Sequence, residues 1–235
     1  MIMQCLTDEN VNSVVDRVMN GIINDIITDK YRPGDKLPTE TELSQRYDAG
    51  RNSVREAVKI LQAYGVLYIK RADGTYVSEN YNQRMLDPML YSIILRKNSR
   101  DDFVGLRSMI DIGVLSVVVQ RRDVTEYLPG IYLTFGELSA ELHCENADLE
   151  RVVELDNRFH QKIAEASRNP MICTMAEYIN RITMPSRLET TRKALSDKNN
   201  IDNFIELHRE ILNVIESRKT EDIVRVVNEH YIYWK

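Results

Sequence analysis

Three histidines and one aspartate in the second half of the chain have the types and spacing of a metal site. The 235-residue chain has only four histidines, and three of them belong to this set, which consists of Asp156, His160, His208 and His230. Asp156 and His160 are four positions apart, so their side chains lie next to each other on one helix face. Imidazole and carboxylate ligands suit zinc, nickel, manganese or iron, of which zinc is our first expectation. The set therefore predicts a divalent metal ion with four protein ligands.

The positions of His208 and His230 predict two antiparallel helices that bring these side chains together. A turn is expected at residues 217–219, about eleven residues from each histidine. At 1.5 Å per residue, both imidazoles then lie roughly 16 Å from the turn, at the same level. Facing helices in a bundle are a common place for a metal site. The alternative for each histidine taken alone is a packed or solvated helix residue, which is our expectation for His143.

A metal held in this way has three uses, and the residues alone leave them open. Four protein ligands on a metal that accepts more leave coordination positions for water or an anion, which suits a sensor, while a purely structural or sensory metal is a second use. Catalytic zinc also combines protein ligands with an open position, but a hydrolase needs a general base beside the metal-bound water. The chain has no HExxH motif, and Glu154 and Glu165 share the predicted helix of Asp156 without a suitable placement. We therefore expect no enzyme.

Helical periodicity dominates the part of the chain that contains this set. We place a domain boundary at the polar run that begins at residue 80, and expect an all-α antiparallel bundle of six to seven helices over residues 80–235. Capping residues such as Asp148, and Asn169 followed by Pro170, support the helix starts. The predicted helices, with a kink at Pro185 in the fifth, are 85–97, 101–122, 128–143, 149–167, 170–194, 201–217 and 221–234.

The first part of the chain, residues 1–79, has the pattern of a winged helix-turn-helix. Thr39, with Glu42 three residues later, is the capping-box signature of a short helix over residues 40–47. The fold class is therefore mainly α, with this head followed by the helical bundle. The other expected elements of the head are an amphipathic helix ending near residue 28, a helix with a buried stripe at Val54, Val58 and Leu61, and strands at 66–70 and 75–77 around a hairpin tip at 72–74.

Positive charge is concentrated where a winged helix-turn-helix meets DNA. The chain has a net charge of −5, but residues 46–71 contain six basic and two acidic residues, a local net of +4. The first turn of the second helix of such a motif meets base edges and phosphates. The alternative is a generic three-helix bundle with a hairpin, whose arginines are only solvated. The predicted DNA-contacting residues of this helix and of the wing are Arg51, Asn52, Ser53, Arg55, Lys70 and Arg71.

The composition also bounds the cellular compartment. Three widely separated cysteines without a CxxC pair suit reduced thiols in the cytosol better than a disulfide framework. The apolar runs are too short to span a membrane, and the N-terminal run MIMQCLTDEN has no basic residue, unlike a secretory signal. We expect a cytoplasmic protein with no membrane partner.

The segment at 33–77 resembles the DNA-binding domain of the GntR family of bacterial regulators. The resemblance rests on PGDKLPTETELS, on the R-x-x-V-R-E-A-V core and on the terminal G-T-Y-V. It implies that Arg51 and Arg55 contact the operator, with Asn52 and Ser53 nearby and Gly74 at the wing tip in the minor groove. It also implies a homodimer on a palindromic operator, because the two-fold symmetry of the protein then matches that of the DNA.

Two positions depart from the pattern of that family. Many relatives have arginine in the short helix where this chain has Thr41, so one phosphate or base contact is expected to be missing. A serine or threonine usually precedes the first recognition arginine, but this chain has Gly50, which offers no side-chain oxygen as a cap. Both departures leave the expected fold unchanged, but the operator sequence of those relatives does not carry over to this chain.

The second part resembles the ligand-binding domain of the FadR subfamily, which is of the FCD type. The run LDNRFHQKI, followed by ASRNP, is similar to its D-x-x-F-H motif, and all four metal positions are present, as in its metal-containing branch. The resemblance implies that a small carboxylate or hydroxy acid is the effector and meets the open metal positions. It also implies Arg107, in R-S-M-I-D, as a second carboxylate contact, because a guanidinium matches a carboxylate bidentately. The alternative is a surface ion pair between Arg107 and Asp111.

Overall fold

The computed structural model describes residues 13–80, 85 and 100–232. The chain forms two compact units, Met1–Arg96 and Lys97–Lys235, and each is considered by itself. The division falls in a segment outside the described residues, so the predicted boundary after residue 79 stays a prediction. The helix predicted at 85–97 also lies outside them, apart from residue 85.

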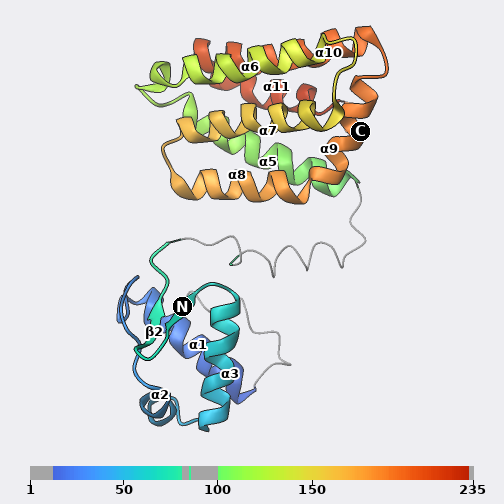
Figure 1. The fold of residues 1–235 in the computed structure, drawn as a ribbon. Helices are drawn as coiled ribbons and strands as arrows, with labels where there is room; N and C mark the ends of the chain where they lie inside the picture. Colours follow the sequence, from blue (N-terminus) through green and yellow to red (C-terminus); the bar gives the residue numbers. More distant parts are fainter. Residues whose placement is uncertain (1–12, 81–84, 86–99, 233–235) are drawn as a thin grey trace. The chain divides into compact units, whose positions relative to one another are not determined.

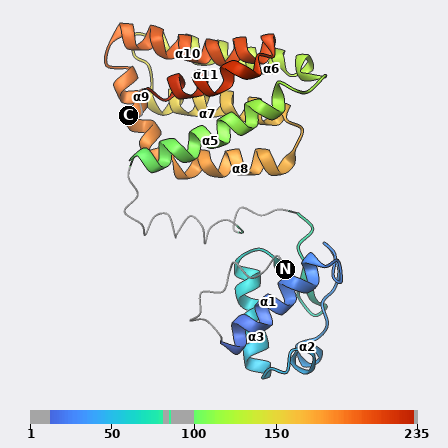
Figure 2. The same ribbon diagram turned by 180° about the vertical axis from the view of Figure 1, so that it is seen from behind.

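Within its described residues, the first unit is a head of three helices with a two-stranded wing, and its course can be followed in Figure 1 and Figure 2. Its helices are α1 (Val14–Ile27), α2 (Glu40–Arg46) and α3 (Arg51–Ala63), and its antiparallel strands are β1 (Leu67–Lys70) and β2 (Gly74–Val77). α3 packs against α1, α2 and β1. The buried apolar core of the head consists of Val18, Ile22, Leu37, Leu43, Val54, Ala57, Val58, Leu61, Leu67 and Val77.

Local sequence signals explain where α2 and α3 begin. The Thr39 hydroxyl accepts a hydrogen bond from the Glu42 backbone N–H, and the Glu42 carboxylate accepts one from the Thr39 backbone N–H. This is the predicted capping box, and it is confirmed. α3 begins after Gly50, which makes no side-chain cap, as expected. The basic N-terminal end of α3 therefore follows the turn directly, and no side chain caps it.

The tip of the wing lies one residue earlier than predicted. Lys70 pairs with Gly74, so Gly74 is the first residue of β2 and residues 71–73 form the turn. Ala72 takes the left-handed conformation there, with a φ of 60°. Gly74 has a φ of 156°, which residues with a side chain rarely adopt, and a Cβ there would also lie 2.6 Å from Cε of the flexible Lys36 side chain. Gly74 therefore adjoins the tip and is not its last turn residue.

The second unit is an all-α bundle built around α7 (Figure 1). α7 packs against α5, α6, α8 and α9, and α10 packs against α6, α9 and α11. The predicted mainly-α fold, a winged helix-turn-helix followed by a helical bundle, is confirmed. The α-helices of this unit are α5 (Arg100–Val118), α6 (Leu128–Leu142), α7 (Leu149–Ala166), α8 (Pro170–Ile182), α9 (Met184–Ala194), α10 (Lys198–Ser217) and α11 (Ile223–His230).

The helix predicted at 170–194 is two helices, not one kinked helix. Thr183 ends α8 and precedes α9, and its hydroxyl donates to the Ile179 carbonyl at 2.7 Å. The sequence explains the break, because Pro185 has no N–H to donate four residues back and is favoured in the first turn of a helix over the interior of one. The break matters because it gives α9 its own direction.

The ends of the last helices also differ from the prediction. α10 begins three residues earlier than expected, at Lys198, because the Asp197 side chain accepts from the Asn199 backbone N–H. The final segment is a 3₁₀ turn (Thr220–Asp222) followed by the shorter α11. Within the described part of the chain, no helix combines the length and apolar character needed to cross a bilayer.

Candidate functional site

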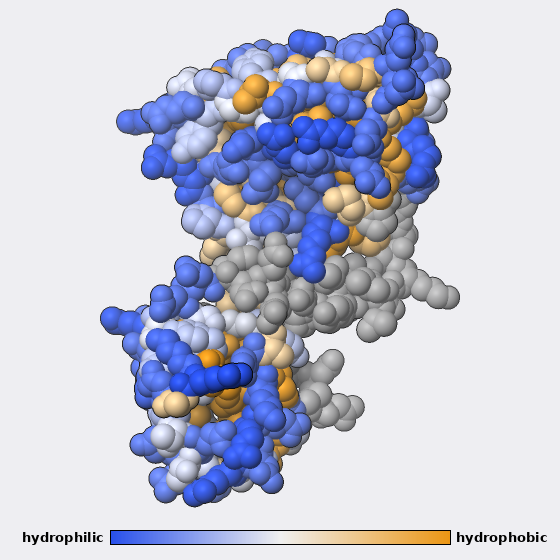
Figure 3. Space-filling view, viewed as in Figure 1, coloured by the Kyte–Doolittle hydropathy of each residue, from blue (hydrophilic) through white to orange (hydrophobic). Residues whose placement is uncertain are grey.

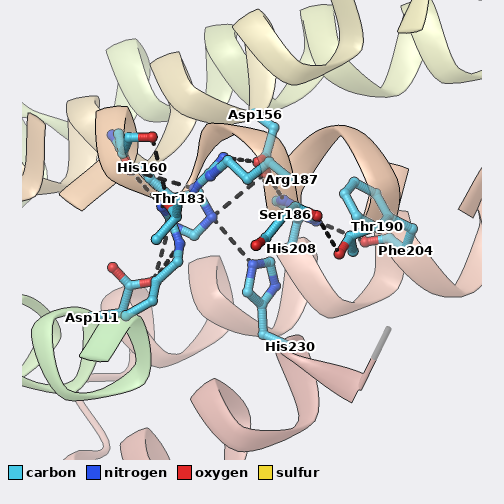
Figure 4. A network of polar contacts seen from close by, with 12 residues as sticks. Asp111, Asp156, His160, Thr183, Ser186, Arg187, Thr190, Phe204, His208 and His230 are labelled. Carbon is cyan, nitrogen blue, oxygen red and sulfur yellow. Dashed lines mark hydrogen bonds and ion pairs between the residues drawn. The ribbon is translucent and has the colours of Figure 1, made fainter. Parts of the chain in front are cut away.

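Three helices bring the four predicted metal ligands together. α7 contributes Asp156 and His160, α10 contributes His208, and α11 contributes His230. One possible ligand atom from each residue lies within 4.8 Å of the others. All four residues are buried, with exposed fractions between 0% and 8%, and their side chains converge in Figure 4. The arrangement matches the prediction that antiparallel α10 and α11 place two histidines at one level, with ring centroids 4.5 Å apart.

The contacts of the imidazoles test whether this donor set fits a cation. His208 Nδ1 lies 2.7 Å from the Phe204 carbonyl oxygen, which can only accept, so Nδ1 bears the proton. Its Nε2 faces Asp156 Oδ1 at 2.8 Å, so these two atoms are available as ligands of one cation. His160 Nε2 and His230 Nε2 face each other at 3.2 Å. Electron-pair donors that converge in this way fit a divalent metal.

The electrostatics of the cluster favour the forms that bind metal. Burial opposes ionisation of Asp156, but hydrogen bonds with His160 and His208 outweigh it and hold the pKa of this carboxyl well below its usual range. Burial, and then the neighbouring His208 and His160, hold the pKa of His230 well below its ordinary value. Asp156 is therefore ionised and His230 neutral near pH 7, and metals bind these two forms.

Arg107 lies beside this cluster and is not a surface residue. Only 1% of it is exposed, so it is not a surface residue, although the ion pair with Asp111 named in the alternative is present. Its Nε donates to the Tyr231 hydroxyl at 2.7 Å and its Nη1 donates to Asn180 Oδ1 at 2.6 Å, whereas Asp111 Oδ2 is 3.9 Å away. With Asp156 and others, Arg107 lines a small cavity of about 10 Å³. That volume holds roughly one water molecule.

Arg187 is the main residue of this site that the sequence analysis missed. It is 1% exposed, and its Nη1 donates to Asp156 Oδ2 (Figure 4). A signal for it exists in the chain, because Thr183, Arg187 and Thr190 recur at helical spacing and form a polar stripe. All three are buried, and they share one face because α9 is a helix separate from α8. His143, in contrast, is exposed and caps the end of α6 outside the cluster, as expected.

The predicted DNA-contacting side chains lie mostly on the surface of the head. Figure 3 shows hydrophilic residues over much of the visible face of that unit. Ser53 and Gly74 are half-buried, and the exposed residues of this set are Thr41, Arg51, Asn52, Arg55, Lys70 and Arg71. Nothing in their geometry tests their roles, which stay predictions.

Two contacts in the head bear on how these residues would meet DNA. Arg55 is paired with Glu40 of α2, whose carboxylate accepts from Arg55 Nη2 at 3.0 Å and from Nε at 3.1 Å. At the tip of the wing, Lys36 Nζ donates to Asp73 at 2.8 Å, so the positive charge of Lys36 offsets the negative charge of this carboxylate. The basic character of the head therefore rests most directly on Arg51, Lys70 and Arg71, which form no ion pair with another described residue.

Comparison with known proteins agrees with both units. Residues 14–77 match the model of bacterial regulatory proteins, gntR family, and residues 133–232 match that of the FCD domain. The chain belongs to the GntR family. This GntR-family protein is a transcription regulator with a DNA-binding helix-turn-helix and an FCD ligand-binding domain, and it is not an enzyme, since its domains and relatives are those of regulators.

The relatives resemble it over most of their length. The HTH-type transcriptional regulator LutR of Bacillus subtilis (strain 168) is 26% identical over 187 residues, which cover 79% of this chain and 83% of LutR. The galactonate operon transcriptional repressor of Escherichia coli (strain K12) is 23% identical over 85% of this chain and 86% of its own. Among solved structures, Streptococcus agalactiae GntR is similar in fold, with a TM-score of 0.58 and 24% identity over 93% of this chain and 97% of that one.

Proposed function

We propose that this GntR-family regulator senses a small carboxylate or hydroxy acid through a divalent metal, and that the acid controls its affinity for operator DNA. Asp156, His160, His208 and His230 would hold the metal, with zinc as the first expectation and nickel, manganese or iron as others. The metal would supply positive charge and coordination positions that accept an acid oxygen. The chain's own part is to hold the ligands in place, exclude water and convert binding into a change of operator affinity.

The convergence of four buried potential ligand atoms within 4.8 Å carries this proposal. Buried polar groups are normally satisfied by partners, and three imidazoles with one carboxylate in van der Waals reach are hard to satisfy without a shared cation. The cluster also lies on three different helices, so it can report on their packing.

Arg107 supports an acidic effector. It is a buried guanidinium that lines the same cavity as Asp156 and His230, so it can meet a second oxygen of an acid bound at the metal. A cavity of about 10 Å³ has no room for such an acid, so side chains lining it must move when the acid binds. This movement is what a sensor requires, because an effector acts only through a difference in affinity between two conformations. A hydroxy acid also occurs in the name of one relative, the galactonate operon repressor.

The output is DNA binding by the head, which we propose to be that of a homodimer on a palindromic operator. The proposed contacts are Arg51, Asn52, Ser53 and Arg55 of α3, Thr41 of α2, and Lys70, Arg71 and Gly74 of the wing. Half-sites one helical turn apart, or multiples of it, match such a dimer. Because its target is chromosomal DNA, the cytoplasm is the proposed compartment.

The test combines metal analysis with operator binding. An operator is first selected from a random DNA library, and candidate carboxylic and hydroxy acids are then titrated against the complex with metal present and after chelation. We expect one acid to change operator affinity at least fivefold, and only in the metal-loaded protein. His208→Ala should abolish both metal binding and the response, while His143→Ala, at an exposed histidine outside the cluster, should keep both. If no acid changes operator affinity in the metal-loaded protein, the sensor part is wrong.

A second candidate keeps the metal and removes the acid. The four ligands are buried in the bundle, so the metal can be purely structural, or its arrival can itself be the signal. Chelation separates these cases. Removal of a structural metal lowers the melting temperature of the helical unit whether or not DNA is present, whereas a sensory metal changes operator affinity by itself.

A further inference from the structure

We infer that Arg187 positions Asp156 by reserving one carboxylate oxygen, so that only the other oxygen is available to a metal. Arg187 would thereby keep a coordination position open for the effector. The inference rests on the proposed metal site and deepens it, because it assigns a role to a residue that is not a ligand. It concerns the mode in which Asp156 binds, and not whether the four ligands bind at all.

The two oxygens of Asp156 have different surroundings. Oδ1 faces the imidazoles, at 2.8 Å from His208 Nε2 and 3.6 Å from His160 Nε2. Oδ2 accepts a hydrogen bond from Arg187 Nη1. A carboxylate can bind a metal through one oxygen or through both. Here the guanidinium occupies the second oxygen, so the carboxylate is set up to bind through Oδ1 alone.

The guanidinium has a second anchor that fixes its orientation. Arg187 Nη2 lies 3.4 Å from Asn180 Oδ1 of α8, and the same oxygen accepts from Arg107 Nη1 at 2.6 Å. Because a guanidinium is planar and presents its donors in a rigid fork, contacts to two acceptors determine where each nitrogen points. Asn180 therefore ties Arg187 to Arg107, so the arginine that holds Asp156 and the arginine proposed to meet the acid share one neutral acceptor.

Burial makes this contact persistent. Arg187 is 1% exposed and Asp156 is 6% exposed, so neither charge can exchange its partner for bulk water at low cost. Four ligands that each use one atom leave coordination positions open on a metal that accepts five or six. If Asp156 bound through both oxygens, one of those positions would close, which leaves none on a metal that accepts five donors and only one on a metal that accepts six. Arg187 prevents this by holding Oδ2.

The test is the visible absorption spectrum of the protein loaded with Co²⁺ alone, which reports the ligand set and geometry of the metal. Arg187→Met removes the donor to Oδ2, and we expect it to bind one Co²⁺ per chain with an altered spectrum. Arg187→Lys retains a positive donor and should give a spectrum closer to that of the unaltered protein. Thr190→Val is the matched control, because Thr190 lines the same cavity from the same helix but donates to the Ser186 carbonyl. It should leave the spectrum unchanged.

A second variant guards against misfolding of Arg187→Met. Asn180→Asp has nearly the same size and offers Arg187 a competing carboxylate, so it should shift the spectrum in the same direction, by less, while Arg187 remains. If both variants bind Co²⁺ and give the spectrum of the unaltered protein, Arg187 does not set the binding mode and the inference fails, although the metal site stands. If the unaltered protein binds no metal, the proposed function itself fails.

Discussion

The head and the helical unit place their functional residues in opposite ways. In the head, the proposed DNA contacts come from one continuous stretch, 41–74, and most of them are exposed. In the helical unit, the polar site is assembled from residues between 107 and 231 and is almost wholly buried. An exposed side chain can be changed with little effect on folding, whereas a buried charged group cannot. Function and stability should therefore be separable in the head and coupled in the helical unit.

Asp156→Ala should have the largest effect. It leaves Arg187 buried without its carboxylate partner, and breaking a buried pair in this way costs about 3–5 kcal/mol. We expect that loss in the unfolding free energy of the helical unit, together with loss of metal binding. Hydrogen exchange followed by mass spectrometry reads the two units separately and should show faster exchange in α7, α10 and α11 but not in α1 and α3. If the variant were as stable as the unaltered protein, function and stability would not be coupled in the helical unit.

Arg51→Ala tests the opposite case in the head. Arg51 is exposed at the first position of α3, so its loss should change the unfolding free energy by no more than about 0.5 kcal/mol. Its proposed contact with a base should instead cost operator affinity about 1–3 kcal/mol at fixed salt. Fluorescence anisotropy with the selected operator measures this loss. A lower melting temperature with unchanged operator affinity would contradict the separation of function from stability.

Thr41→Arg should have a smaller effect, and it should be a gain. Thr41 is exposed on α2, and an arginine there would restore the phosphate or base contact that many relatives have. One added phosphate contact per head makes the slope of log affinity against log salt steeper by about 0.9 for each head. Operator titrations at several salt concentrations measure that slope. An unchanged slope would mean that α2 does not approach the phosphates.

Asp123→Asn should have the smallest effect, because Asp123 is only half-buried, and it tests whether burial, rather than the choice of unit, decides the outcome. Asp123 accepts hydrogen bonds from Arg121 at 2.8 Å and Arg168 at 2.9 Å, and these bonds lower its pKa to about 2. A carboxyl with a lowered pKa stabilises the fold above its unfolded value of about 3.9 and loses that contribution as pH falls toward its folded value.

The variant should therefore melt slightly below the unaltered protein at pH 7, and the difference should shrink between about pH 4 and pH 2. Melting curves across that range check the sign. A difference that grows on acidification would contradict it. A loss at pH 7 as large as that of Asp156→Ala would show that position in the helical unit matters more than exposure.

Local signals in the amino-acid sequence determined most of the elements. The capping box of Thr39 and Glu42, the caps at Asp148 and Asn169, and the apolar spacing of α3 each act within a few residues, so they can be read without knowing the rest of the fold. The four candidate ligands were also predictable. His208 and His230 stand at equal distances from one turn, and Asp156 and His160 share a helix face, so helix geometry alone brings each pair together.

Only the tertiary structure decided what surrounds those ligands. The contact of Arg187 with Asp156 joins α9 to α7 across 31 positions of sequence, and it depends on the break that Pro185 imposes at Thr183. The burial of Arg107 depends likewise on Tyr231, 124 positions away. Caps and periodicity are properties of neighbouring residues and are written in order along the chain. Helix packing decides the partner of a buried charge, because a charged group removed from water has to pair with a polar group that the packing brings within reach.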